Sequence, residues 1–170
     1  TKGVSHQAIY DTVVSAQYRA AREIEGCDVI TIPDTVFGDV KDVHPPHKKT
    51  AGDRLAALAL HHDYGKSVTF SGPRFVQAKA NGGTVTVSFE RIDKGLKTSD
   101  GKAPNWFEIA GTDKKFVEAT AKIVGDTVIV SSPEVTAPQF IRMAWNNIAE
   151  QNLRDKNGWP VFSFNAEITP

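Results

Sequence analysis

A cluster of acidic and basic side chains in the first third of the chain is the strongest candidate for chemistry. Residues 38–48 read Gly-Asp-Val-Lys-Asp-Val-His-Pro-Pro-His-Lys, with Asp39, Asp42, His44 and His47 close together. They follow a strand-like run and precede a helical pattern, the kind of edge where open α/β sheets bind their ligands. Backbone dipoles near a helix N-terminus favour the neutral imidazole, so His44 is a candidate general base. Asp42 or Asp39 could hold its other ring nitrogen.

The histidines have other possible roles. His44 could simply cap a turn, and His44, His47 and Asp42 have a spacing that could chelate a metal ion. Neither cysteine nor an acidic cluster completes a recognisable metal-ligand set. His61 and His62 are adjacent, so they point about 100° apart on a helix, and we expect one to be buried and one solvated.

Two further reactive side chains have weaker support. Thr1 could act as an N-terminal nucleophile only by virtue of its position. Cys27 follows a helix-terminating glycine, and we expect it to be a small buried hydrophobe. Neither residue has a partner in the sequence pattern that would mark it as catalytic.

The elements that must position His44 alternate between helix and strand. A helix is predicted between Ser5, as its cap, and Gly26, with apolar residues at helical spacing. The run Asp28–Ile32 predicts a strand covered on both faces, as in a parallel sheet. A second helix is predicted from His44-Pro45-Pro46 to about Gly65. This order is typical of one piece of an α/β domain.

From about Ser67 the pattern changes to alternation with period two. It predicts strands at 84–90, 117–123, 127–130 and 140–145, broken by glycines and prolines. Strands at this spacing indicate an all-β sandwich. The three tryptophans of this part could stack on sugar rings, but we expect core packing, above all for Trp145.

Composition excludes several function classes. The 170 residues carry 20 basic and 20 acidic side chains, so the formal net charge of zero argues against a nucleic-acid partner. No apolar run reaches the ~18–20 residues of a membrane span. One cysteine excludes an internal disulfide framework. The start lacks both an initiator methionine and a signal peptide, so we expect a cut precursor or a sequence that begins inside a larger protein.

The segment Asp42-Val43-His44-Pro45, with Lys48 or Lys49, Gly52, Arg54-Leu55-Ala56 and Tyr64-Gly65, resembles the sialate O-acetylesterase family, a branch of the SGNH (GDSL-like) hydrolases. The resemblance continues in order along nearly the whole chain. Further matching segments are Gln17, Ser71-Gly72-Pro73, Val87-Ser88-Phe89, Gly95-Leu96, Phe107–Gly111, Ser131–Val135, Ala144-Trp145, Asn152-Leu153 and Gly158-Trp159-Pro160 with Phe162 or Phe164.

This resemblance implies hydrolysis of acetyl esters on sugars by a Ser-His(-Asp) mechanism without a metal ion or cofactor. His44 matches the family's general base, and Asp42 is its candidate orienting carboxylate. The implied fold is α/β plus all-β. Residues 1–66 would be the C-terminal part of an SGNH catalytic domain, flavodoxin-like with three α/β/α layers, and residues 67–170 a β-sandwich domain.

Two departures from the family pattern shape the expected function. No Gly-Asp-Ser-type or Gly-Glu-Ser-type segment is present, because Gly38-Asp39, Gly52-Asp53 and Gly125-Asp126 are followed by other residues. Many SGNH enzymes place an aspartate three positions before the histidine, where this chain has Lys41. Asp42, Asp39 or a backbone carbonyl could therefore orient His44, and a serine–histidine dyad also fits.

The expected partners follow from the missing serine. We expect a serine-bearing N-terminal segment or second subunit, an O-acetylated sugar as substrate, and neither a nucleic acid nor a membrane. The chain alone should be inactive. The family suggests a secreted, lysosomal or periplasmic location. Alternatives are a non-catalytic carbohydrate-binding or structural β-module and a metal-dependent hydrolase.

Overall fold

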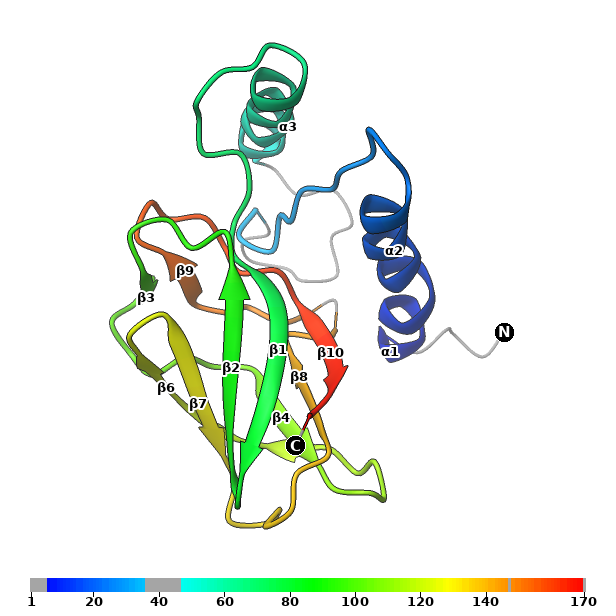
Figure 1. The fold of residues 1–170 in the computed structure, drawn as a ribbon, viewed down its shortest axis with the longest axis vertical. Coiled ribbons are helices and arrows are strands. Elements are labelled where there is room, and N and C mark those ends of the chain that lie inside the picture. Colours follow the sequence, from blue (N-terminus) through cyan, green and yellow to red (C-terminus); the bar gives the residue numbers. More distant parts are fainter. Residues whose placement is uncertain (1–5, 36–46, 147, 170) are drawn as a thin grey trace. The chain divides into compact units, whose positions relative to one another are not determined.

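The computed structural model describes residues 6–35, 47–146 and 148–169 (Figure 1). The chain divides into two compact units. The first comprises Thr1–Ser71 with Trp145–Ala149, and the second comprises Gly72–Ala144 with Glu150–Pro170.

The first unit is helical. An unbroken helical run consists of α1 (His6–Ile9), the π-helical turn η1 (Tyr10–Val14) and α2 (Ser15–Glu23). In the π-helical turn the backbone N–H of Ser15 reaches the carbonyl of Tyr10. The helix predicted between Ser5 and Gly26 is thus confirmed over these residues, and Gly26 follows with a φ of 74°. No described helix is long and apolar enough to cross a membrane.

The second predicted helix is present but shorter. Helix α3 spans Lys48–His62, with His47 as its N-cap, and the predicted start at His44-Pro45-Pro46 lies outside the described residues. Beyond its end, Gly65 has a φ of 61°, the left-handed conformation that commonly follows a helix. The backbone N–H of Lys66 donates to the carbonyl of Leu60 and closes this end.

The strand predicted over Asp28–Ile32 is wrong in the described structure. These residues have no strand pairing, and the described part of the first unit contains no strand at all. A β-branched run becomes a strand only when a neighbouring strand supplies the ladder of hydrogen bonds. Without such a neighbour the run forms no strand and ends in a turn, in which the N–H of Thr35 donates to the carbonyl of Ile32.

The second unit is β-rich and entirely antiparallel in its described sheets. One four-stranded sheet has the order β1-β2-β7-β6, another has the order β10-β8-β4-β5, and β3 pairs with β9. The strands are β1 (Arg74–Asn81), β2 (Thr84–Glu90), β3 (Leu96–Thr98), β4 (Phe107–Ala110), β5 (Val117–Glu118), β6 (Thr120–Val124), β7 (Thr127–Ser131), β8 (Phe140–Met143), β9 (Leu153–Asp155) and β10 (Phe164–Glu167).

Period-two alternation buries one face of each large sheet. Val85 and Val87 of β2 are fully buried, as is Val130 of β7, which lies opposite Val85. Phe164 belongs to β10, in the sheet of order β10-β8-β4-β5. The centroid of its ring lies 4.5 Å from that of Phe75 and 6.3 Å from that of Phe107. The inner faces of the two sheets therefore share one aromatic and aliphatic core.

The sequence identified most of these strands but not all. Strands 84–90 and 127–130 are confirmed, and the predicted strand 140–145 corresponds to β8. The predicted strand 117–123 is two strands, because the chain passes from one sheet to the other at Ala119. Strands β1, β3, β4, β9 and β10 were not predicted, because the eight residues of β1 lack clear alternation and the other four strands are only three or four residues long. The β-rich character is shown, whereas the three-layer SGNH domain remains a prediction.

Candidate functional site

The predicted catalytic residues His44 and Asp42, and the alternative Asp39, lie outside the described residues. The structure describes the segments on either side of them, which are the turn that ends at Thr35 and the helix α3 that begins at Lys48. No group of three potential metal ligands occurs among the described residues. Because His44 and Asp42 fall outside that search, the metal hypothesis for them stays untested.

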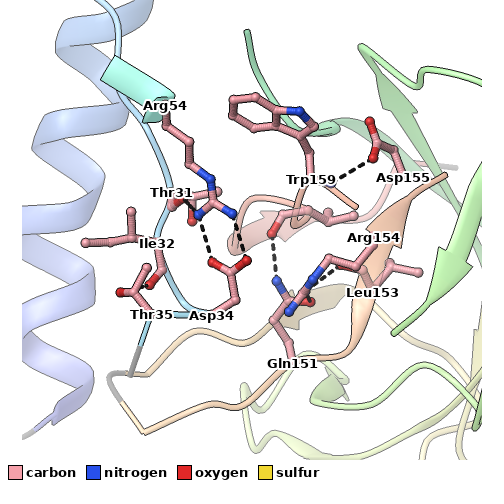
Figure 2. Close-up of polar contacts among 11 residues, drawn as sticks. Thr31, Ile32, Asp34, Thr35, Arg54, Gln151, Leu153, Arg154, Asp155 and Trp159 are labelled. Carbon is pink, nitrogen blue, oxygen red and sulfur yellow. Dashed lines mark hydrogen bonds and ion pairs between the residues drawn. The ribbon is translucent and has the colours of Figure 1, made fainter. Parts of the chain in front are cut away.

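A buried ion pair connects these two flanking segments (Figure 2). Nη1 and Nη2 of Arg54 donate to Oδ1 and Oδ2 of Asp34, both at 2.7 Å. Nη1 also donates to the backbone carbonyl of Thr31 at 2.7 Å. The side chains of Arg54 and Asp34 are 9% and 25% exposed. One guanidinium therefore binds a carboxylate and a carbonyl of the same turn.

The local sequence explains both halves of this pair. Pro33 restricts its own backbone and favours a turn, and Thr35 completes it with hydrogen bonds from its backbone N–H and its hydroxyl to the carbonyl of Ile32. Thr35 is 1% exposed. Arg54 and Leu58 are the buried residues of α3 and lie four positions apart, on one face of the helix.

This ion pair has a specific geometry, and its removal lowers the stability of the fold. Bidentate arginine–carboxylate pairs have fixed relative orientations because two parallel N–H···O bonds must form together. Removing one partner of a fully buried pair costs about 3 to 5 kcal/mol, and the cost here is smaller because Asp34 is 25% exposed. Here the pair joins the residues at the two ends of segment 36–46, which carries His44. Sequence analysis did not identify this contact, because no local pattern relates residues 20 positions apart.

The far end of α3 has contacts of its own. The ring of His61 stacks on Phe70 with centroids 3.8 Å apart, and Nε2 of His62 lies 3.2 Å from Oδ2 of Asp28. His61 is half-buried and His62 is exposed, with ring planes 80° apart. The two ring centroids nevertheless lie 5.0 Å apart and both rings contact Phe70, so the prediction that they point to different surroundings is wrong.

The predictions for Trp145 and Cys27 have opposite outcomes. Trp145 packs in the first unit, where it is 4% exposed and donates its indole N–H to Oδ1 of Asp11 at 2.8 Å. Its ring meets that of Tyr10 edge to face, and burial raises the pKa of the Tyr10 phenol. Cys27 is exposed, so its predicted burial is wrong. It lies just beyond the end of α2, outside any helix or strand.

In the second unit a buried carboxylate and a half-buried tryptophan share a turn. The backbone N–H of Trp159 donates to Oδ1 of Asp155 at 2.8 Å (Figure 2). Asp155 is fully buried, and burial raises the pKa of its carboxyl. These contacts stabilise the turn after β9 and suggest no reaction.

Comparison with known proteins indicates one class of relative. No family model and no curated protein matches the chain. A solved structure described as that of a novel carbohydrate acetylesterase from Xanthomonas citri is 37% identical, with a TM-score of 0.75 over 81% of this chain. The match covers 32% of that esterase, so the chain spans about a third of its length. The chain is therefore similar in sequence and structure to one part of a carbohydrate acetylesterase, which supports a relationship to the carbohydrate esterases.

Proposed function

We propose that this chain is part of a carbohydrate O-acetylesterase that removes acetyl groups from sugars, of the sialate O-acetylesterase type. The observation that carries the proposal is the 37% identity and TM-score of 0.75 to a carbohydrate acetylesterase over most of the chain. The Asp42-Val43-His44-Pro45 segment supports it independently, because it was identified from the sequence as resembling such esterases.

In this proposal His44 is the general base. It accepts the proton of a serine hydroxyl while the serine oxygen attacks the acetyl carbonyl carbon. The tetrahedral intermediate collapses, and His44 returns the proton to the sugar oxygen as the alcohol leaves. Water, activated by His44, then hydrolyses the acetyl-serine to acetate and free serine. Asp42 holds the imidazole in the required orientation.

The serine comes from another segment or subunit of the same enzyme in this proposal. Apolar side chains on the first unit's helices support such a partner, since Leu55 is 56% exposed, Val13 52% and Ile24 59%. Gly52 of α3 also has nothing within 4 Å of the position that a Cβ would occupy. We propose that the serine-bearing polypeptide covers these faces, and that the enzyme is secreted, lysosomal or periplasmic.

The test begins with the natively purified protein. Intact mass spectrometry identifies any polypeptide that co-purifies, and hydrolysis of O-acetylated sialic acid, acetylated xylan and a simple aryl acetate is measured beside it. We expect a partner with a Gly-Asp-Ser-type or Gly-Glu-Ser-type segment. His44→Ala should lower kcat by a factor on the order of 10⁴ without dissociating the complex.

A neighbouring histidine serves as the matched variant. His47 is exposed, three positions further on, and its side chain caps no helix N–H. His47→Ala should leave kcat nearly unchanged. If it abolishes turnover as His44→Ala does, and a chelator has the same effect, the metal-dependent hydrolase is correct instead.

The remaining outcome concerns the β-rich unit. If the purified chain has no partner, hydrolyses none of the three substrates, and binds saccharides equally well with and without His44→Ala, the esterase proposal fails. The non-catalytic β-module would then be the better description.

A further inference from the structure

We propose that Trp106 is a saccharide-binding residue of the second unit, on which the C–H face of an uncharged pyranose stacks. This inference rests on the proposed function in one respect, that the enzyme acts on a saccharide. The site itself performs no chemistry, and the residues that form it all belong to the second unit.

The backbone of Trp106 has a conformation that a large side chain rarely adopts. Its φ is 61°, in the left-handed region that favours glycine. Trp106 stands directly before β4, and its carbonyl accepts a hydrogen bond from the N–H of Ala144 at 2.9 Å. This bond continues the ladder in which Phe107 pairs with Met143. Glycine would adopt the same geometry without strain, so the tryptophan is present at a cost to stability, as is common at functional sites.

The indole of Trp106 lacks the partners that a structural tryptophan has. Within the described residues its ring makes no aromatic or cation–π contact, and its N–H makes no hydrogen bond. Its nitrogen is not one of the buried polar atoms that lack a hydrogen bond, so it is accessible to solvent. Trp145, by contrast, is 4% exposed, donates its N–H to Asp11 and meets the ring of Tyr10. A partly exposed indole with an accessible N–H can stack on a ligand and donate a hydrogen bond to it.

A network of side-chain amides holds the loop that precedes Trp106. Asn105 and Asn152 bind each other reciprocally, because the backbone N–H of each donates to the side-chain oxygen of the other, at 3.1 and 2.9 Å. The amide nitrogen of Asn152 donates to Oδ1 of Asp100 and to the carbonyl of Ala103, both at 2.9 Å. Asn152 is 5% exposed. The backbone beside the indole is therefore fixed before a ligand arrives, which lowers the entropic cost of binding.

The polar groups of this loop fit a saccharide better than a protein partner. Asp100 and Lys102 are exposed and Asn105 is partly exposed, so the loop offers hydrogen-bonding groups to hydroxyls. An aromatic anchor of a protein interface is instead surrounded by contacts that exclude water. The axial C–H bonds of β-linked glucose or xylose form an apolar face that packs on an aromatic ring. Stacking selects for this face rather than for charge, so the ligand class is a neutral β-linked pyranose chain.

The experiment is titration calorimetry of the full chain with xylohexaose and with cellohexaose. We expect Trp106→Gly to weaken the binding of the preferred oligosaccharide by about 10-fold or more, because the stacking surface is removed. Its Tm should stay within about 3 °C of wild type, because relief of the backbone strain offsets the lost contacts. Lys94→Gly is the matched control, since Lys94 is exposed and has a φ of 60°. It relieves the same strain and should leave the affinity within about twofold of wild type.

A second readout follows the indole N–H by NMR. The Trp106 signal is identified by its absence in Trp106→Gly, and it should shift when xylohexaose or cellohexaose binds. The Trp145 signal should not shift, because its N–H is bound to Asp11.

Three results would overturn the proposal. The first is that wild type binds neither oligosaccharide, or that Trp106→Gly binds as wild type does. The second is a large fall in the Tm of Trp106→Gly, which would show a packing role. The third is that Trp106→Gly releases the serine-bearing polypeptide with saccharide affinity unchanged, which would show a protein interface. If the oligosaccharide binds through Trp106 but the protein cleaves no acetyl ester, the binding site holds while the proposed function fails.

Discussion

The two units differ in how completely they bury their own apolar residues. Nearly all described buried hydrophobic residues belong to the second unit, whereas the first contributes Leu58 and Trp145. The difference follows from architecture. Two sheets can face each other and cover their inner surfaces, but a few helices without a sheet leave an apolar face uncovered.

The two units also differ in what supports their arginine–carboxylate ion pairs, Arg54–Asp34 in the first unit and Arg142–Glu108 in the second. Arg142 and Glu108 lie on strands whose register already places them opposite each other, and the guanidinium also lies 4.1 Å from the centroid of the Phe116 ring. Arg54 and Asp34 are 20 positions apart, in a helix and in a turn, so no strand register places them beside each other.

The largest expected difference is in the free energy of unfolding of two leucine-to-alanine variants, one in each unit. Leu153 of β9 is fully buried and Leu55 of α3 is 56% exposed. Leu153→Ala should lower the free energy of unfolding by about 2 to 5 kcal/mol, because it leaves a cavity in a packed core. Leu55→Ala should change it by less than about 0.5 kcal/mol in the chain alone, as for ordinary surface substitutions. Urea unfolding followed by circular dichroism measures both.

The Leu55→Ala variant also tests whether the proposed partner polypeptide covers the first unit. If the serine-bearing polypeptide covers α3, Leu55→Ala should weaken its association although it leaves the isolated chain unaffected. If Leu55→Ala in the chain alone lowers the free energy of unfolding by several kcal/mol, the first unit has a complete core and the two units do not differ in this respect.

A smaller effect is expected at Gly52. This glycine is inside α3, and a Cβ added to it would have no other atom within 4 Å. Gly52→Ala should stabilise the chain alone by about 0.5 to 1 kcal/mol, because alanine loses less backbone entropy in a helix. In the complex it should weaken association if the partner approaches the helix backbone at this position. Thermal unfolding and a binding titration distinguish the two effects.

The smallest effect concerns the pH dependence of the second unit. Burial raises the pKa of Asp155 above its ordinary value of 3.8. The folded state then holds this proton more tightly than the unfolded state. Its contribution to stability is fully present below the unfolded pKa and is lost as pH rises through the folded-state pKa. Asp155→Asn should remove this slope in urea unfolding measured at several acidic pH values.

Asp100 provides the control of opposite sign. Hydrogen bonds from the backbone N–H of Lys102 and from the side chain of Asn152 lower its pKa below 3.8. Its contribution is present above the unfolded pKa and is lost as pH falls through the folded-state pKa. Slopes of the same sign in Asp155→Asn and Asp100→Asn would contradict the assignment.

Local patterns predicted the elements whose stability depends on nearby residues. The helix at 6–23 and the strands β2 and β7 follow from side-chain periodicity, which reflects burial of one face. The strand predicted at Asp28–Ile32 failed because pairing needs a neighbour, which no window of sequence supplies. The division of 117–123 between two sheets likewise depends on which strands lie opposite.

For the candidate site too, the sequence determined one part and only the tertiary structure the other. The sequence by itself determined which chemical groups are available, a histidine with nearby carboxylates between an apolar run and a helix, in a segment that resembles the sialate O-acetylesterase family. Only the tertiary structure showed that Arg54 binds Asp34 and Thr31, because residues 20 or more positions apart meet through the course of the whole chain. Residue type determines which bonds a side chain can form, and the fold determines which of those bonds are made.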